Sequence, residues 1–117
     1  MDIKNLKIEL DENSYNILMG SNLLQENLLK DFVEKKEVML VYDENLDNSK
    51  IQEIQSAYLS TGARTSISTG IKATEENKSY KSLNQIHDLL IENHFSRDCL
   101  LIGFGGGIIC DLTGFAA

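Results

Sequence analysis

Short strand-like runs alternate with helical patterns along most of the chain, and this alternation constrains the fold more than any other feature. Residues 38–42, 64–69 and 99–104 have the length and turn-bounded pattern of strands. Apolar residues at helical spacing separate them, over about 49–61 and 75–94. Such alternation predicts a parallel sheet with helices on its faces. We therefore expect an α/β, Rossmann-like domain with a parallel or mixed sheet and flanking helices.

The start of the chain follows a different pattern. Residues 4–10 and 14–20 are short and apolar-rich, and the intervening Asp-Glu-Asn predicts a hairpin turn. Paired leucines in residues 21–30 predict a helix with Ser21 as its N-cap.

Two further helix starts carry capping signals. Ser49 and Gln52 form an S-x-x-Q capping box ahead of the helix that should end at Gly62. Thr74, followed by two glutamates, predicts the cap of the next helix, and a last helix should begin near Ile108.

Composition limits the partners and the compartment. The formal net charge is -7, from 18 acidic and 11 basic residues, which disfavours nucleic acid and anionic membranes as partners. The chain shows no basic-then-apolar leader pattern and no apolar run of about 18 residues, so we expect a cytoplasmic protein. Cys99 and Cys110 lack zinc-type spacing, and we expect both to be small buried thiols.

Polar and glycine residues follow each predicted strand of the sheet. Asp43 and Asn45 follow the first, Glu75 and Lys78 the second, and residues 105–107, all glycine, the third. Ligands of parallel α/β sheets bind outside the carboxyl ends of the strands. These residues should therefore meet at one edge and form a binding site.

The glycine turn is suited to an anion. Three glycines between a strand and a helix offer backbone N–H groups and the positive end of the helix dipole. Asp111 follows about one helical turn later and could meet a hydroxyl or amide. The dinucleotide fingerprint G-x-G-x-x-G fails, because Ile108 stands at its third glycine. Spacing alone fits a tight strand–helix turn without a ligand equally well.

Several segments together point to a family. "GGGIICDLTGFAA" resembles the G-G-G-x-x-x-D-x-x-G-F-x-A segment of 3-dehydroquinate synthases and related sugar phosphate cyclases. "VYDEN" is similar to that family's D-x-N strand end, "EENKS" to its G-E-x-x-K-S, and "FSRDCLLIGFGGG" to its approach to the glycines. The resemblance covers nearly all of this chain and about the first third of a typical member. One departure is Ala73–Thr74, which stands where the family has Asp-Gly.

The resemblance implies that this chain binds NAD. The implied cofactor-binding residues are Asp43, Asn45, Glu75, Lys78, Gly106, Gly107, Ile108 and Asp111. By this resemblance Asp43 and Asn45 contact the adenosine end, and Glu75 accepts from ribose hydroxyls. Lys78 supplies a donor and a positive charge, and Asp111 reaches the nicotinamide side. The backbone of the glycine turn donates to the pyrophosphate.

The resemblance also implies what a longer chain would do. Family members convert 3-deoxy-D-arabino-heptulosonate 7-phosphate to 3-dehydroquinate in the shikimate pathway, with phosphate elimination, using NAD and a divalent zinc or cobalt ion. The metal and the sugar phosphate belong to a C-terminal helical domain. Residues 1–117 are thus expected to be an incomplete N-terminal NAD-binding domain, inactive alone, with neither catalytic nor metal-binding residues. We expect a homodimer or self-association through apolar surface left exposed.

The histidine spacing argues against a metal site, and the sequence leaves two other functions open. His87 and His94 are seven residues apart, about 10 Å along a helix, which is too far for one zinc ion, so we expect surface roles. The chain could instead come from another sugar phosphate cyclase or a polyol dehydrogenase, although its "GFAA" favours a cyclase. It could also be a non-catalytic nucleotide-binding or interaction domain.

Overall fold

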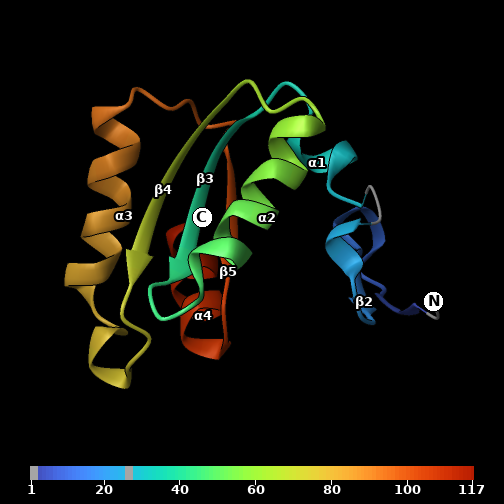
Figure 1. The fold of residues 1–117 in the computed structure, drawn as a ribbon, viewed down its shortest axis with the longest axis horizontal. Helices are drawn as coiled ribbons and strands as arrows, with labels where there is room; N and C mark the ends of the chain where they lie inside the picture. Colours follow the sequence, from blue (N-terminus) through green and yellow to red (C-terminus); the bar gives the residue numbers. More distant parts are fainter. Residues whose placement is uncertain (1–2, 26–27) are drawn as a thin grey trace.

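The computed structural model describes residues 3–25 and 28–117, which form a three-layer α/β body and a separate hairpin (Figure 1). The body has a parallel sheet in the order β4-β3-β5. The hairpin strands β1 and β2 pair antiparallel in a sheet of their own. The strands are β1 (Lys4–Ile8), β2 (Tyr15–Met19), β3 (Glu37–Asp43), β4 (Thr65–Ile71) and β5 (Leu100–Phe104). The predicted α/β class and the predicted hairpin are both confirmed.

Helices cover both faces of the parallel sheet. In Figure 1, α2 lies in front of the sheet and α4 behind it, while α3 flanks β4. No helix in the described part of the chain is both long and apolar enough to cross a membrane. The helices are α1 (Lys30–Val33), α2 (Asn48–Ser60), α3 (Tyr80–Glu92) and α4 (Gly107–Ala116), with 3-10 turns η1 (Asp11–Asn13), η2 (Leu23–Gln25) and η3 (Glu75–Asn77).

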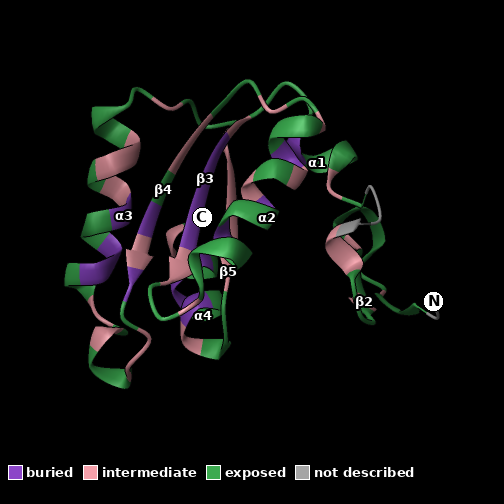
Figure 2. Ribbon diagram, viewed as in Figure 1, coloured by how far each residue is buried: buried purple, intermediate pink, exposed green. Residues whose placement is uncertain are grey.

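Strand β3 is the centre of the hydrophobic core (Figure 2). Val38 and Leu40 face one buried cluster, together with apolar side chains of α2. Met39 and Val41 face the other cluster, together with side chains of α3 and α4. All four side chains are fully buried, because β3 has a strand on each edge and helices on each face. The apolar run predicted to be a buried strand therefore forms the middle of the body.

The capping box predicted at Ser49 is wrong. Asp47 is the N-cap of α2, with an extended backbone, and its carbonyl accepts from the N–H groups of Lys50 and Ile51. Asp47 takes the N-cap position through its backbone alone, without a side-chain cap hydrogen bond, so the helix begins earlier and Ser49 lies inside it. The apolar face predicted for this helix is correct, since Ile51, Ile54 and Tyr58 are all buried.

The cap predicted for the next helix is also wrong. Thr74 precedes η3, and α3 begins only at Tyr80. Ser79 is the actual N-cap, because its hydroxyl accepts from the Ser82 N–H at 3.3 Å. The cause is that η3 interposes one tight turn between β4 and α3, which leaves both glutamates before the helix.

The helix predicted for residues 21–30 does not form as one element. Asn22 has a left-handed backbone (φ 56°), η2 follows it, and α1 begins only at Lys30. Residues 26–27, in the middle of the predicted helix, lie outside the described part. Leu24 and Leu29 nevertheless pack against the α2-side cluster, so the leucine pattern marks core contacts rather than a continuous helix.

Candidate functional site

The carboxyl ends of the three parallel strands meet at one edge of the sheet, where the strand arrows end in Figure 1. Asp43 ends β3, η3 and Lys78 follow β4, and the glycine turn follows β5. The Glu44 N–H donates to the Ile71 carbonyl at 3.1 Å and ties the first two ends together. The three sequence segments singled out above are thus neighbours in space.

Asp43 shapes the turn after β3. Its Oδ1 accepts from the Asn45 N–H at 2.9 Å, and its carbonyl accepts from the Leu46 N–H at 3.0 Å. Asp43 is half-buried and Asn45 is exposed. Since one carboxylate oxygen holds the turn, the other can accept from a ligand hydroxyl.

Gly105 brings the turn after β5 against the end of β3. A Cβ at this position would lie 3.2 Å from the Asp43 Cβ and 2.8 Å from the Ile109 Cγ1. Contacts that close require something to shift, so glycine permits this approach. The contact places Asp43 beside the start of α4.

Gly106 and Gly107 face open space. A Cβ built on either residue meets no atom within 4 Å, and Gly106, the N-cap of α4, has an ordinary φ of -81°. Neither packing nor backbone conformation therefore explains glycine here. The first N–H groups of a helix lack partners within it, and Gly107 and Ile108 supply two of them. An anion can approach this backbone closely, as the sequence predicts.

Lys78 joins Asp111 to Glu75. Its Nζ lies 3.1 Å from Asp111 Oδ2 and 3.9 Å from Glu75 Oε2. The hydrogen bond to Asp111, followed by the negative charge of Glu75, raises the pKa of Lys78 above its usual value. All three side chains remain solvent-accessible, so the cluster is open to a ligand. The lysine offsets the negative charge beside the glycine turn.

A hollow of about 370 Å³ adjoins this ion pair. Lys78 and Asp111 form its polar part, and apolar side chains of α3 and α4 form the rest. Its lining residues are Lys78, Ser79, Tyr80, Leu83, Asp111, Leu112 and Phe115. A flat, partly polar group would fit chemically between such walls.

Of the eight predicted residues, the structure brings Glu75, Lys78 and Asp111 into one cluster and places Asp43 against the glycine turn. Asn45 reaches this group only through its backbone bond to Asp43. The Ile108 side chain packs in the core on the α3–α4 side, which leaves its backbone for the site.

Sequence reasoning missed the residues that set the position of α4. A Cβ on Gly103 would lie 2.7 Å from Thr113 Oγ1, so a glycine lets the helix rest directly on β5. Thr113 is buried and donates its hydroxyl to the Ile109 carbonyl at 2.7 Å. A glycine inside an apolar strand is the signal that could have revealed this close approach.

The cysteine prediction is wrong for one of the two thiols. Cys110 is exposed, with its Sγ 3.8 Å from the Gly105 carbonyl, because it lies on the outer side of α4. Cys99 is half-buried, and burial raises the pKa of its thiol.

Neither histidine joins a cluster with metal-ligand character. His87 Nε2 lies 3.0 Å from the Ala116 carbonyl and links α3 to the end of α4. Within residues 3–25 and 28–117, no three His, Cys, Asp or Glu side chains are grouped so that they could hold a metal ion.

Known proteins match this chain closely in sequence. Residues 68–117, which include the glycine turn, match the family model described as 3-dehydroquinate synthase N-terminal. The 3-dehydroquinate synthase of Hydrogenovibrio crunogenus is 37% identical over 116 residues, and that of Acinetobacter baylyi is 33% identical over 115. The chain is similar in sequence to the 3-dehydroquinate synthases. Each match covers 98% of this chain and 32% of the relative, so the chain spans about a third of their length.

Solved structures of 2-deoxy-scyllo-inosose synthase share the fold. A crystal structure of 2-deoxy-scyllo-inosose synthase matches with a TM-score of 0.80 at 15% identity, over 97% of this chain and 32% of that one. A second, complexed with carbaglucose-6-phosphate, NAD+ and Co2+, gives 0.79 at 17% identity, over 97% and 31%. At these identities the likeness establishes the fold alone.

Proposed function

We propose that this chain binds NAD at the carboxyl edge of its parallel sheet. The open backbone at Gly106 and Gly107 carries the proposal, because two glycines with no packing or conformational reason lie at a helix start. The residues fit the group: a diphosphate would occupy the space that a Cβ would otherwise fill. The NAD+ in the related 2-deoxy-scyllo-inosose synthase structure supports this choice of nucleotide.

Each neighbouring residue has a defined task in this proposal. The first N–H groups of α4 donate to the pyrophosphate. The positive charge of Lys78, which contacts Asp111, offsets the negative charges of both the diphosphate and the Asp111 carboxylate. Asp43 and Asn45 orient the adenosine end, and Glu75 accepts from ribose hydroxyls. Asp111 and the adjoining hollow take the nicotinamide end.

The activity of the longer relatives is proposed for this chain only as part of a larger protein. That activity is the NAD- and metal-dependent conversion of 3-deoxy-D-arabino-heptulosonate 7-phosphate to 3-dehydroquinate, in the shikimate pathway. NAD would supply transient hydride acceptance in that reaction. The described residues offer no fitting group for zinc or cobalt, so we assign no step to a metal here. These 117 residues alone should bind cofactor without turnover. The cytoplasmic location remains a prediction.

Calorimetric titration with NAD tests the proposal. We expect saturable binding that weakens when Asp111 is replaced by alanine, because the nicotinamide end would lose an acceptor. Far-UV circular dichroism of the same samples establishes that each is folded. A folded wild-type chain that binds no NAD at millimolar concentration would refute the proposal and favour a non-catalytic interaction domain.

A further inference from the structure

Three loops meet at the amino end of the parallel sheet, where the strand arrows begin in Figure 1. They are the segments that lead into β3, β4 and β5. Two backbone hydrogen bonds join the first two loops. The Lys35 N–H donates to the Gly62 carbonyl at 2.8 Å, and the Arg64 N–H donates to the Lys36 carbonyl at 2.8 Å. These two loops are therefore held together at the end of the sheet opposite the candidate site.

Glu37 ties the third loop to the other two and holds Arg64 beside them. Its carboxylate accepts from both the N–H and the hydroxyl of Ser96, and its side chain is only 12% exposed. The same Oε1 atom lies 3.4 Å from Arg64 Nη2. The Arg64 side chain is 64% exposed, and a guanidinium has five N–H donors, so most of its donors are left for a ligand.

A hollow of about 490 Å³ lies between these loops. Its lining is mainly polar, in contrast to the hollow beside Asp111, whose walls are mainly apolar. Apart from Ser96, every lining residue is charged, and the two signs balance. The cations are Lys35, Lys36 and Arg64, and the carboxylates are Glu34, Glu37 and Asp98. This balance is local, because the whole chain has a net charge of -7.

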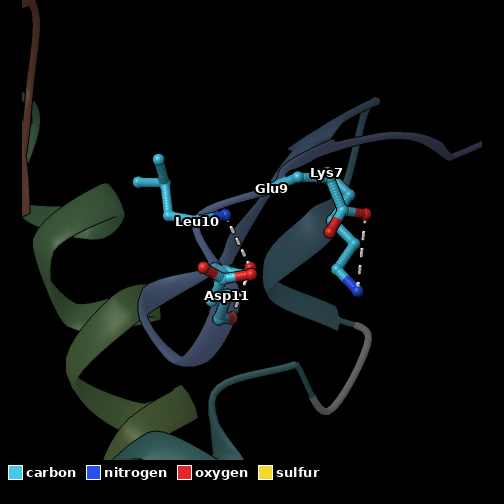
Figure 3. Close-up of polar contacts among 5 residues, drawn as sticks. Lys7, Glu9, Leu10 and Asp11 are labelled. Atoms are coloured by element: carbon cyan, nitrogen blue, oxygen red, sulfur yellow. Dashed lines mark hydrogen bonds and ion pairs between the residues drawn. The ribbon is translucent and has the colours of Figure 1, made fainter.

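Four of these charged side chains form no ion pair with any residue in 3–25 or 28–117. They are two cations and two carboxylates, Lys35, Lys36, Glu34 and Asp98. The hairpin tip shows the contrasting case, in which neighbouring polar groups satisfy one another (Figure 3). There Lys7 and Glu9 pair at 3.7 Å, and the Leu10 N–H donates to Ser14 Oγ at 2.8 Å. The hollow at the amino end therefore offers both signs of charge to a ligand.

We propose that this hollow binds a small zwitterion with a carboxylate and an ammonium group, which is the chemistry of a free α-amino acid. The ligand's carboxylate accepts from the Arg64 guanidinium and the Lys36 ammonium group, and the ligand's ammonium group donates to the Asp98 carboxylate. A ligand of balanced charge is favoured over a simple ion. An anion would be repelled by Glu34 and Asp98 and by the net charge of -7, and a cation would be repelled by the three cations of the lining.

This site is separate from the proposed NAD site. The two sites lie at opposite ends of β3 and share no residue. Strand β3 has 7 residues, and a rise of about 3.3 Å per residue places its ends about 20 Å apart. Failure of NAD binding would therefore leave this inference intact, and the reverse also holds.

Titration with L-serine, followed by heteronuclear NMR of the backbone amides at constant ionic strength, tests the proposal. We expect saturable shifts centred on the three loops, with a Kd in the millimolar range, because a few charge-assisted hydrogen bonds form at a partly solvated site. Acetate and ethylammonium each carry only one of the two charges, so each should bind about fivefold more weakly. Absence of saturable shifts with serine, or equal binding of serine and acetate, would overturn the proposal.

Two substitutions separate the two ends of the ligand. Asp98→Asn removes the acceptor of the ammonium group, so serine should bind about fivefold more weakly, whereas acetate should bind no more weakly than it binds the wild type. Lys36→Met removes a cation and should weaken both ligands. Arg97→Gln is the matched control, because Arg97 is exposed next to Asp98 but does not line the hollow, and it should bind serine like the wild type.

The same spectra show whether each variant is folded. If Asp98→Asn weakens serine and acetate equally, the ammonium end is wrongly placed. If Arg97→Gln weakens serine as much as Lys36→Met does, binding follows net charge rather than this hollow, and the proposal fails.

Discussion

Lys78 connects the carboxylates of the candidate site, because its ammonium group contacts Asp111 and lies close to Glu75. Without this cation, Asp111 would stand uncompensated beside the start of α4, where we place the diphosphate. The raised pKa of Lys78 keeps it protonated throughout the physiological range. At the scale of single residues, the site thus depends on one positive charge in a strongly acidic protein.

Replacing Lys78 with methionine should weaken NAD binding about fivefold or more, the effect of losing one solvent-exposed charged contact and gaining repulsion from Asp111. Calorimetric titration measures the change. Lys81→Met removes the same charge from an exposed position on α3 and should bind NAD like the wild type. Equal loss in both variants would mean that only net charge matters.

Glu37 stabilises the opposite end of the sheet. Its Oε1 accepts from the Ser96 N–H at 2.9 Å and the Ser96 hydroxyl at 2.8 Å, and lies 3.4 Å from Arg64 Nη2. These contacts, first the backbone hydrogen bond, hold the pKa of Glu37 below its usual value. A depressed pKa in the folded state contributes stability above the unfolded pKa of about 4.3, and that contribution disappears as the pH falls through the folded pKa.

Glu37→Gln should therefore lower the melting temperature at pH 7 and much less near pH 3. Thermal unfolding followed by circular dichroism at several pH values gives both curves. Glu53→Gln removes one partner of an exposed ion pair on α2, and its melting temperature should change with pH in the same way as that of the wild type. A gap between Glu37→Gln and wild type that stays constant with pH would contradict the assignment.

The sequence predicts which residues share the site better than it predicts how they touch. Asp43 and Gly105 could be placed at one edge because parallel strands bring their carboxyl ends together. The ion pair between Lys78 and Asp111 could not be predicted from the sequence, because it depends on how α3 and α4 are oriented on the sheet. The structure shows that Thr74, which stands where the family has glycine, has an extended backbone (φ -120°) that any residue can adopt, so this position does not require glycine.

At the scale of elements, the glycine turn combines a packing requirement at Gly105 with the open backbone that the proposed diphosphate needs at Gly107. Gly105 is needed for packing, because a Cβ there would collide with Ile109. Gly107 is not needed for packing, because its Cβ direction is open. The helix starts were predicted less well than the glycine turn. Asp47 takes the N-cap position of α2 without a side-chain hydrogen bond, and Ser79 caps α3 only after the intervening turn η3.

Alanine substitutions separate these requirements. Gly105→Ala should destabilise the fold by about 1–3 kcal/mol through overpacking. Gly107→Ala should leave the melting temperature unchanged or slightly higher, since alanine favours a helix by up to about 1 kcal/mol. It should nevertheless weaken NAD binding, because the methyl group occupies the space proposed for the diphosphate. Thermal melts and NAD titration of both variants check this, and undiminished affinity in Gly107→Ala would contradict the placement.

At the scale of the whole molecule, β3 couples the two halves of the body. Its alternate side chains enter the cluster under α2 and the cluster under α3 and α4, so neither can open fully without disturbing the strand. The hairpin lies outside this arrangement. The chain should therefore contain one cooperative body and one locally opening hairpin.

Native-state hydrogen exchange distinguishes these two units. Amides of β3 should exchange only by global unfolding, whereas hairpin amides should exchange far faster through local opening in dilute, monomeric protein.

Ile109→Ala removes a fully buried side chain and should cost about 2–5 kcal/mol, which accelerates β3 exchange about 30- to 5,000-fold. The same substitution should leave hairpin exchange unchanged, because the hairpin opens without the core. Ile91→Ala, at an exposed position, should affect neither unit. Equal acceleration of hairpin and β3 amides by Ile109→Ala would show that the hairpin belongs to the cooperative body after all.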